Sequence, residues 1–393
     1  MVESAGPRRV LFVSNGYGED SIAAEIIRRL PKGVIAEAYP TIGDGHAFRS
    51  VCAVVGPRAQ MASQGWRNVK GSMLRDLLSG GAATILPGLQ FARRVREHYD
   101  RVVVVGDIVG IAGGFLAGAS DIVYLDVYKT GFGRRYWPIE RWLIGKTAAV
   151  TFCRSDRLAA QLRAAGLDAR CVGNVMMDTI SYGDYDVAAR RSHACAVALL
   201  PGSRQFTAES FALQVEALAL VPPAQRPDIF LAIADNVSLA ALAKGAGLVV
   251  KGPMTGEAGD AGGLVGGGLT IHVARGATGN LIEGADVVLS QAGTATIQAL
   301  GLGRPVLTFI KPRDRRSRFR DESALFGEAR TVVAADAERI ADAVGRLLGD
   351  PAERVRLGAI GRERIGGPGA IEAIIEAIVG PKVLRPELAP SGD

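Results

Sequence analysis

Two aspartates each stand directly after a run of apolar residues of the kind that forms a buried strand. Asp107 follows Val102–Gly106, and Asp126 follows Ile122–Leu125. The carboxyl ends of parallel strands line the ligand crevice of an α/β domain, so a carboxylate there can remove a proton from a substrate hydroxyl. We predict Asp107 as the general base, with Asp126 as the alternative. An aspartate that only caps the following helix is the structural interpretation.

An acidic loop follows the first apolar run, Val10–Ser14. Its glycines permit a tight turn beneath a helix start, as in phosphate-binding loops, but carboxylates compete with phosphate for the positive end of the helix dipole. Such a loop suits the hydroxyl groups of a sugar better. We therefore predict an acceptor site formed by Asn15, Gly16, Glu19 and Asp20. The alternative is that Glu19 or Asp20 only stabilises the helix start.

The second half of the sequence contains a short loop suited to a diphosphate. After the run Val197–Leu200, Gly202 allows close backbone approach, Ser203 offers a hydroxyl group and Arg204 can hold phosphate oxygens bidentately. We predict these three residues as donor-binding, and a plain strand–turn–helix connection is the structural alternative.

A longer segment of small residues, Ser290–Pro305, follows another apolar run and opens a helix. Gly293 and Thr294 would present backbone N–H groups at the helix start, where anions bind. Gln298 lies four residues beyond Thr294, on the same helical face, where it could meet a ribose or base. The predicted donor-binding residues here are Gly293, Thr294, Ala295, Thr296 and Gln298. Small residues selected for close helix–sheet packing are the alternative.

Basic residues outnumber acidic ones, 46 to 40, and leave a formal net charge of +6. Six of the cations lie in Lys311–Arg320, close in sequence to the predicted phosphate loop. Such a run is a solvated face, a diphosphate site or an anionic-lipid site. The charge distribution favours an anionic ligand or membrane surface, and we predict no nucleic-acid partner.

Two segments combine apolar or aromatic residues with basic ones: Leu77–Ala92, followed by Arg93, Arg94 and Arg96, and Tyr128–Trp142. They favour contact with an anionic membrane surface; a sugar-stacking surface or a well-packed loop are the alternatives. No apolar run reaches the roughly 18–20 residues that span a bilayer. The four cysteines lack metal-site spacing and the N-terminus has no signal segment, so we predict a cytoplasmic protein with free thiols.

Helical patterns alternate with the apolar runs along the chain, which is typical of parallel sheets covered by helices. A length of 393 residues favours two domains. The pattern lapses between residues 174 and 195, so we predict an N-terminal α/β domain (1–173), a linker or hinge (174–195), a C-terminal α/β domain (196–380) and a flexible tail (381–393). Gly256–Gly268, with seven glycines in thirteen residues, is predicted to be a mobile surface loop.

Several of these segments together resemble lipid-A-disaccharide synthases. Leu199–Arg204 and Gly293–Thr296, continuing through Gly303–Pro305, are similar to the donor-site signatures of that family. Cys171–Asp178 resembles its hinge segment, and Val105–Asp107 resembles the strand end that bears its proposed catalytic aspartate. Order and spacing agree from about residue 9 to about residue 380.

The resemblance implies a GT-B glycosyltransferase, with two Rossmann-like domains facing an interdomain cleft and helices at the C-terminus. It implies an acceptor site in the first domain, a nucleotide-diphosphate sugar, UDP-linked, in the second, and inverting, metal-independent transfer to a lipid or lipid-linked acceptor. It also implies no cofactor and peripheral association with the cytoplasmic face of the inner membrane. Two departures indicate a divergent branch: Gln298 replaces a glutamate of the family, and Ser14–Asp20 differs from the family's Ala-Gly-Glu-x-Ser-Gly-Asp loop.

Two other functions would use the same donor motifs. A nucleotide-sugar epimerase needs several acids and a histidine around the sugar, yet none of His46, His98, His193 and His272 lies in a donor motif. A non-catalytic nucleotide-sugar-binding protein would share the motifs, because they report binding and not turnover. Asp184-Tyr185-Asp186 matches a D-x-D metal site, but it lies in the predicted linker, away from any strand end, so we predict no metal.

Overall fold

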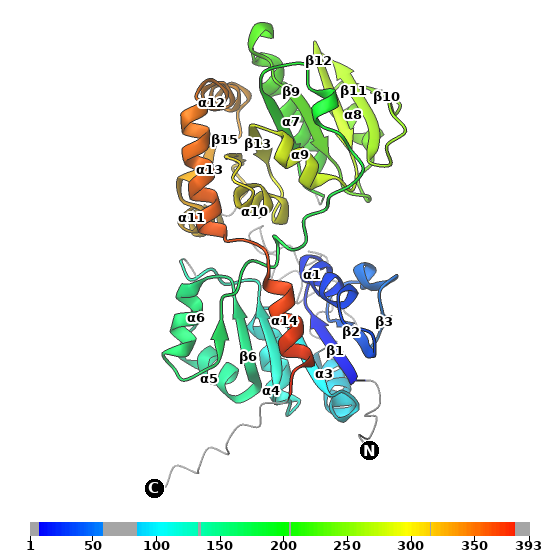
Figure 1. The fold of residues 1–393 in the computed structure, drawn as a ribbon, viewed down its shortest axis with the longest axis vertical. Helices are drawn as coiled ribbons and strands as arrows, with labels where there is room; N and C mark the ends of the chain where they lie inside the picture. The colour runs from blue at the N-terminus through cyan, green and yellow to red at the C-terminus, as the bar shows by residue number, and fades with distance from the viewer. Residues whose placement is uncertain (1–7, 58–84, 133–134, 204–205, 315, 382–393) are drawn as a thin grey trace. The chain divides into compact units, whose positions relative to one another are not determined.

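The computed structural model describes residues 8–57, 85–132, 135–203, 206–314 and 316–381. The chain forms two compact units, the first made of residues 1–175 with 369–393 and the second of residues 176–368. The first unit therefore contains both ends of the chain, and in Figure 1 it holds the blue strands as well as the red C-terminal helix.

A parallel sheet forms the centre of the first unit, and its described strands are ordered β3-β2-β1-β4-β5-β6-β7. These strands are β1 (Arg8–Ser14), β2 (Val34–Pro40), β3 (Ala53–Val54), β4 (Arg101–Gly106), β5 (Ile122–Asp126), β6 (Ala148–Cys153) and β7 (Ala169–Arg170). Every neighbouring pair is parallel. The loops that follow β1, β4 and β5 consequently lie along one edge of the sheet.

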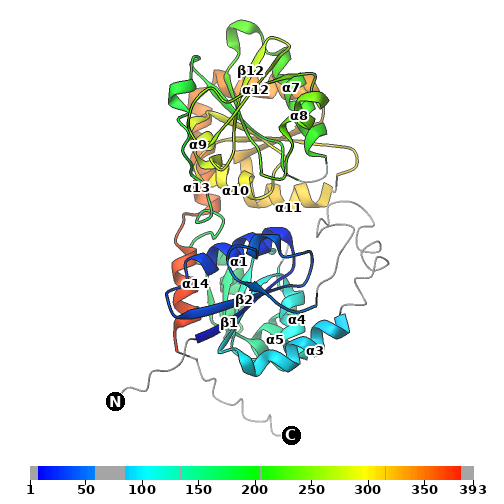
Figure 2. The ribbon, with the colours of Figure 1, turned by 90° about the vertical axis from the view of Figure 1, so that its right-hand side faces the viewer.

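Helices cover both faces of this sheet. The helices are α1 (Tyr17–Arg28), α3 (Ile85–Val95), α4 (Ile108–Leu116), α5 (Pro138–Thr147), α6 (Asp156–Arg163) and α14 (Ala370–Val379), with the 3₁₀ turns η1 (His46–Phe48) and η3 (Arg96–His98). Ile111 of α4, Ile144 of α5 and Leu158 of α6 share one core with Tyr124 of β5. Figure 2 shows α14 on the side of the sheet opposite α4 and α5.

The second unit repeats this plan with an antiparallel extension. Its described strands are ordered β10-β11-β12-β9-β8-β13-β14-β15. They are β8 (Ala196–Leu200), β9 (Asp228–Ala232), β10 (Val249–Lys251), β11 (Asp260–Gly266), β12 (Leu269–Ala274), β13 (Val287–Ser290), β14 (Val306–Ile310) and β15 (Arg330–Ala334). Pairs from β12 to β15 are parallel, whereas β11 runs antiparallel to both β10 and β12.

The helices of the second unit also lie on both faces of its sheet. They are α7 (Thr207–Leu220), α8 (Leu239–Gly245), α9 (Thr278–Gly284), α10 (Thr294–Gly301), α11 (Arg316–Phe326), α12 (Ala337–Gly349) and α13 (Pro351–Ile365), with η4 (Ala188–Arg190), η5 (Pro223–Gln225) and η6 (Gly327–Ala329). Phe211 of α7, Leu242 of α8 and Val344 of α12 pack in one core with the strands. The strands β8, β9, β13 and β14 are buried, as their continuous apolar runs predict.

The last helix belongs to the first unit, which corrects the predicted extent of the C-terminal domain (196–380). Ile371 and Ile374 of α14 are fully buried. Arg8 donates to the carbonyls of Ile378 and Gly380, at 3.1 and 3.0 Å, and Arg101 donates to that of Gly380 at 3.1 Å. These contacts join the end of the described chain to β1 and β4. Residues 382–393, most of the predicted tail, lie outside the described residues.

The glycine-rich segment 256–268 is not a mobile loop, so that prediction was wrong. It contains β11, paired on both sides. Gly267 and Gly268 make the two-residue connection to β12 with positive φ angles of 57° and 72°, as a type I′ hairpin turn requires. A Cβ atom on Gly262 would lie 2.3 Å from the carbonyl oxygen of Lys251. The glycines thus permit a tight turn and close approach of neighbouring strands.

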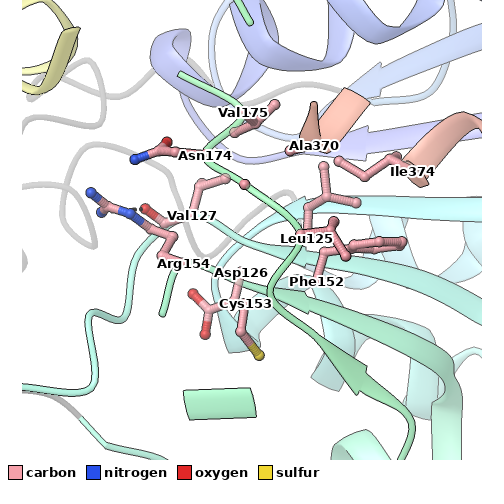
Figure 3. A pocket seen from close by; sticks show the side chains of 12 residues that line it. Leu125, Asp126, Val127, Phe152, Cys153, Arg154, Asn174, Val175, Ala370 and Ile374 are labelled. Atoms are coloured by element: carbon pink, nitrogen blue, oxygen red, sulfur yellow. Dashed lines mark hydrogen bonds between the residues drawn. The ribbon is translucent and has the colours of Figure 1, made fainter. Parts of the chain in front are cut away.

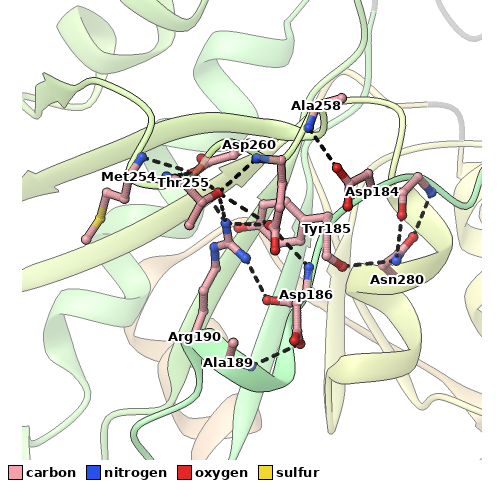
Figure 4. Close-up of polar contacts among 12 residues, drawn as sticks. Asp184, Tyr185, Asp186, Ala189, Arg190, Met254, Thr255, Ala258, Asp260 and Asn280 are labelled. Atoms are coloured by element: carbon pink, nitrogen blue, oxygen red, sulfur yellow. Dashed lines mark hydrogen bonds and ion pairs between the residues drawn. The ribbon is translucent and has the colours of Figure 1, made fainter.

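Much of the predicted linker is fixed to the second unit. Asn280 donates to the carbonyls of Gly183 and Tyr185, both at 3.0 Å. Arg190 forms ion pairs with Glu257 at 2.7 Å and Asp260 at 3.3 Å. Figure 4 shows Asn280 against Tyr185 and, separately, Arg190 against Asp260. Residues 176–190 therefore act as a part of the second unit and not as a free linker.

The D-x-D match lies inside this network. Asp184 accepts a hydrogen bond from the backbone N–H of Ala258 at 3.2 Å, and Asp186 accepts one from Ala189 at 3.0 Å. Figure 4 shows Asp184 and Asp186 engaged with different partners. Both carboxylates have structural contacts here.

Candidate functional site

Asp107 lies at the carboxyl end of β4 and begins α4. Its Oδ1 accepts hydrogen bonds from Asn15 Nδ2 at 2.7 Å and from the backbone N–H of Val109 at 2.9 Å. The second bond caps α4, so the alternative prediction that Asp107 caps the following helix is correct. Asp107 is only partly buried, and Asn15 brings the loop after β1 into contact with it. The structure thus joins the predicted base to one predicted acceptor residue.

Gly106 makes the contact between these loops feasible. Its φ is +153°, and a Cβ atom there would lie 2.0 Å from Asn15 Oδ1. Any side chain at this position would displace the Asn15 amide and with it the hydrogen bond to Asp107. The close approach of Asn15 therefore explains why a glycine precedes Asp107, which the spacing of the motif alone does not show.

The acidic residues of the first loop, Glu19 and Asp20, lie in the first turn of α1, where neither caps the helix. Ser14 Oγ donates to Asp20 Oδ1 at 2.6 Å, and Asp20 is only 1% exposed. Burial raises the pKa of Asp20 to about 7 against the Ser14 hydrogen bond, with the Glu19 and Asp44 carboxylates adding to the rise. Glu19 Oε2 lies 2.5 Å from where a Cβ atom of Gly16 would stand. A carboxylate therefore lies against the turn at which this helix begins, as the acidic loop predicted.

Asp126, the alternative base, has a structural role. Its Oδ1 accepts from the backbone N–H groups of Tyr128 and Lys129, both at 2.9 Å, and its Oδ2 accepts from the Tyr136 hydroxyl at 2.6 Å. The side chain is buried, and burial raises the pKa of Asp126. Three hydrogen bonds fix the loop that follows β5. Asp107 is the better candidate for contact with a substrate.

A small pocket lies beside Asp126 in the first unit. It has a volume of about 30 Å³ and is lined mainly by apolar residues of β5, β6 and α14. Figure 3 shows Arg154 and Asn174 extending their polar ends to the same side of this pocket, away from Asp126. A volume of this size has room for only a few water molecules, so the pocket does not accommodate a sugar and is not the candidate site.

In the second unit, Gln291 joins three strand ends. Its backbone N–H donates to the Leu200 carbonyl at the end of β8, at 2.9 Å. Its Nε2 donates to Thr308 Oγ1 at 3.1 Å and to the Phe309 carbonyl at 2.9 Å, both on β14. Sequence reasoning assigned no role to Gln291, although its place just after β13 was a usable signal. It holds the predicted donor loops together at one edge of the sheet.

The loop after β8 is shaped by Gly202, whose φ is +97°. Ser203 is exposed, and its carbonyl accepts a hydrogen bond from Asn236 Nδ2 at 3.0 Å. Arg204, predicted to hold the diphosphate, lies outside the described residues. The described part of this loop stands next to Gln291, because a Cβ atom on Gly202 would lie 3.7 Å from the Gln291 carbonyl oxygen.

The start of α10 is open. Gly293 and Thr294 are exposed and Ala295 is partly exposed. No side chain caps this helix, and its first turn contains no acidic residue. The first N–H groups of a helix lack partners within it and attract anions. Gly293, Thr294 and Ala295 therefore have the exposure that the predicted donor role requires.

Two predicted donor residues of α10 face elsewhere. Thr296 is buried, and its hydroxyl bonds to Ser290 Oγ at 2.7 Å and to the Ala292 carbonyl at 2.6 Å. Gln298 is buried and donates to the Met176 carbonyl at 2.9 Å. Its helical face is covered by the segment after residue 175. This burial contradicts the ribose contact predicted for Gln298 and the donor contact predicted for Thr296.

Exposed apolar side chains gather on α4 and α5 of the first unit. Val109, Leu116, Ile139 and Trp142 are exposed, and Trp137 is 70% exposed. The rings of Phe115 and Trp142 join the two helices, with centroids 5.2 Å apart. The described part of Tyr128–Trp142 thus keeps the apolar and basic surface that its composition predicted, whereas residues 77–84 of the other segment lie outside the described residues.

Among the residues that the structure describes, no group of His, Cys, Asp or Glu side chains is arranged to hold a metal ion. Within the same residues, no helix is long and apolar enough to cross a membrane.

No protein-family model matches the chain, and no curated protein sequence matches it. Its fold is similar to that of solved structures over nearly the whole length. A structure described as that of a putative UDP-N-acetylglucosamine 2-epimerase from Listeria monocytogenes has a TM-score of 0.59 at 15% identity and covers 95% of this chain and 96% of its own. MurG of Acinetobacter baumannii has a TM-score of 0.58 at 14% identity, with 95% and 99% covered. The glycosyltransferase SnogD of Streptomyces nogalater has a TM-score of 0.54 at 17% identity, with 94% and 98% covered.

These similarities show the GT-B fold, with two Rossmann-like parallel sheets covered by helices. The predicted fold class is confirmed. Because the same fold occurs in a glycosyltransferase and in a UDP-N-acetylglucosamine 2-epimerase, the activity must be argued from the residues at the strand ends.

Proposed function

We propose that this protein is a glycosyltransferase that moves a sugar from a UDP-sugar to a lipid or lipid-linked acceptor. The observation that carries the proposal is the chemical difference between two helix starts. The first turn of α10 has no acidic residue and no side-chain cap, whereas that of α1 contains Glu19 and Asp20. A diphosphate is attracted to the former and repelled by the latter, which leaves the first unit for a neutral sugar or lipid acceptor.

The donor site consists of the α10 start and the loop after β8. Gly293, Thr294 and Ala295 supply backbone N–H groups for the diphosphate, and Gly202 and Ser203 allow its close approach. Arg204 adds a bidentate contact. A Listeria monocytogenes protein of the same fold is named for a UDP-sugar, which supports UDP as the nucleotide.

The acceptor site consists of the loops after β1 and β4, with Asn15 and Glu19, which are only partly buried, contacting the acceptor and Asp107 acting as general base. Gly16 and Asp20, predicted to contact the acceptor as well, are buried and can only shape the loop. The acceptor oxygen attacks the anomeric carbon while its proton passes to the Asp107 carboxylate. The bond from the anomeric carbon to the diphosphate oxygen breaks, and UDP leaves. A single displacement of this kind inverts the anomeric configuration and needs neither a metal nor a cofactor.

An epimerase is the second candidate, because the fold is shared. His193 pairs with Asp228 at the start of β9, at 2.8 Å, and His272 within β12 stacks on Phe230. Neither lies at the strand ends that form the proposed donor site. The absence of a histidine there favours transfer over epimerisation. A protein that binds the nucleotide sugar without turning it over is the third candidate, and only a reaction assay separates it from the transferase.

The apolar surface of α4 and α5 supports a lipid acceptor and a peripheral location on the cytoplasmic face of a membrane. Arg93, Arg94, Arg135 and Lys146 are exposed on α3, on α5 or on the loop before α5. Basic side chains beside exposed tryptophans favour binding to anionic headgroups.

A binding experiment tests the donor site. UDP at about 100 times its Kd should stabilise the protein by roughly 2.7 kcal/mol. Gly293→Asp should abolish this stabilisation, because it introduces a carboxylate at the α10 start, and it should leave folding intact, since no atom lies within 4 Å of the added Cβ. Gly345→Asp, on α12 of the same unit and equally free of contacts, should bind UDP normally. The absence of any nucleoside-diphosphate effect on wild type would overturn the assignment.

A reaction experiment tests the activity. The protein is incubated with the UDP-sugar that binds best and with a total lipid extract, and the products are analysed by mass spectrometry. A glycosylated lipid supports the transferase. An isomerised nucleotide sugar without transfer supports the epimerase, and binding without either product supports the non-catalytic protein.

A further inference from the structure

A charged cluster lies at the edge of the second unit's sheet where β14 ends. Lys311, directly after this strand, is only 9% exposed. Its Nζ donates to Ser210 Oγ at 3.1 Å and pairs with Glu209 Oε1 at 3.2 Å. Both partners belong to the first turn of α7, which follows β8. A buried ammonium group requires such partners, because burial without them disfavours its charge.

Arg313 completes the cluster. It pairs with the other carboxylate oxygen of Glu209, Oε2. The centre of its guanidinium group lies 3.8 Å from the centroid of the Phe206 ring. Phe206 has a φ of +76°, which is strained for a bulky residue and is typically retained where function requires it. The loop after β8 thus ends in a strained residue that supports a cation.

One carboxylate therefore serves two cations through its two oxygens. Asp314 is also near, but its Oδ2 accepts a hydrogen bond from the backbone N–H of Lys311 at 2.8 Å and fixes the turn. The Glu209 side chain is 53% exposed, whereas that of Lys311 is 9% exposed. The carboxylate is the component that can move into water, while the lysine is held in place. Arg313 and then Lys311 hold the pKa of Glu209 below its usual value, so Glu209 is charged at neutral pH.

The cluster shares the edge of the proposed donor site. Phe206 belongs to the same loop as Gly202 and Ser203. Gln291, three residues before the α10 start, bonds to Thr308 and Phe309 on β14, three and two residues before Lys311. The cations therefore follow β14, the strand next to β13, after which the open helix start lies.

We propose that Glu209 is a resident counter-ion that occupies the place of a phosphate group, and that the diphosphate of the donor displaces it to pair with Lys311 and Arg313. The inference rests on the proposed donor function. It adds Lys311 and Arg313 as residues that bind the diphosphate and Glu209 as the carboxylate that competes with it. A diphosphate offers more charge and more oxygens than the single Glu209 carboxylate, so it wins the exchange, whereas a weaker anion does not. Glu209 is then a residue that determines specificity for diphosphates.

The test is a calorimetric titration of UDP and of inorganic pyrophosphate into the wild type, three test variants and two control variants. Glu209→Gln removes the competitor and should tighten both ligands about three- to tenfold, as expected when the ion pairs of Glu209, whose own side chain is exposed, no longer need to be broken. It should also raise the affinity for UMP by a larger factor. Lys311→Met and Arg313→Ala should weaken UDP about tenfold or more. Glu216→Gln, two turns further along α7, and Arg346→Ala, on α12, are the matched controls and should bind as wild type.

The outcomes separate this inference from the donor site itself. If wild type binds UDP and Gly293→Asp abolishes binding, but Glu209→Gln and Arg313→Ala leave the affinity unchanged, the donor site stands and the exchange is refuted. If UDP does not bind but pyrophosphate binds more tightly to Glu209→Gln than to wild type, the proposed function fails and the anion site stands. Weaker binding in Glu209→Gln would also refute the exchange, because Glu209 would then support the site. Thermal melts of each variant show that it is folded.

Discussion

Replacing Asp107 with asparagine separates helix capping from proton removal. Asparagine caps helices about as well as aspartate. An amide oxygen can replace Oδ1 in accepting from Asn15 Nδ2 and from the Val109 N–H, now at 2.7 and 2.9 Å. Loss of the charge at the start of α4 costs about 0.3–1 kcal/mol. The carboxylate base is lost, so turnover should fall by about 10²- to 10⁴-fold.

Asp107→Ala provides the comparison. It removes the cap, at a cost of about 0.5–2 kcal/mol, and leaves the partly buried Asn15 amide without its Asp107 partner, which adds about 1–3 kcal/mol. The expected destabilisation is therefore about 1.5–5 kcal/mol, several times that of the asparagine variant. Both variants should lose turnover, but only the alanine variant should lose substantial stability.

The assay pairs single-turnover transfer on one lipid acceptor with UDP titration and urea unfolding for each variant. Asp350→Asn, which changes the capping residue of α13, controls for the general effect of an uncharged cap. UDP affinity should barely change, because the proposed donor residues lie in the second unit. Near-normal turnover in Asp107→Asn would refute the base role and leave Glu19, the partly buried carboxylate of the first loop, as the next candidate. Loss of folding in that variant would instead make Asp107 structural.

Three further predictions concern other parts of the molecule. Burial raises the pKa of Asp260, but hydrogen bonds from the Gly262 N–H and the Thr255 hydroxyl outweigh it and lower this pKa to about 2. About 2 kcal/mol of stability that is present above pH 4 should therefore be lost as the pH falls towards 2. In acid unfolding, Asp260→Asn should remove this pH dependence. Gly106→Ala should destabilise the first unit and abolish transfer, whereas Gly113→Ala, on α4 with no atom near its Cβ, should stabilise it by about 0.5–1 kcal/mol; equal melts would refute the Asn15 argument. Binding to anionic vesicles should weaken with salt and with Trp137→Ala, and equal affinity for neutral vesicles would contradict a basic docking surface.

The strands that have continuous apolar runs, and the carboxyl ends of those strands, could be predicted because they depend on local sequence. Buried parallel strands need continuous apolar runs, and a run such as Val102–Val105 has few other interpretations. Asp107 could be placed for the same reason, since it is the first polar residue after that run. The exposed Gly293 and Thr294 follow from the small residues that begin α10. In each case neighbours in sequence decide the structure.

The errors arise where distant residues decide. Gln298 and Thr294 lie on one helical face, but the deeper part of that face is covered by residues after 175, so Gln298 bonds to the Met176 carbonyl. The helix α14 returns to β1 and β4 through Arg8 and Arg101, about 370 and 280 residues away in sequence. Glycines in 256–268 suggested mobility, yet antiparallel partners on both sides order them. No local sequence pattern predicts these contacts.

The two units place a helix start after the first strand of each sheet, and both starts contain carboxylates: Glu19 and Asp20 on α1, Glu209 on α7. What differs is the charge around them. Burial raises the pKa of Asp20 to about 7, and the nearby carboxylates of Glu19 and Asp44 add to this rise. A phosphate at the start of α1 would therefore meet further negative charge. The Glu209 carboxylate of α7 pairs with both Lys311 and Arg313, so a phosphate that replaces it would pair with two cations. One strand–helix geometry can therefore select a neutral ligand in the first unit and a diphosphate in the second, and the selection depends on residues from β14 that face α7 across the sheet edge.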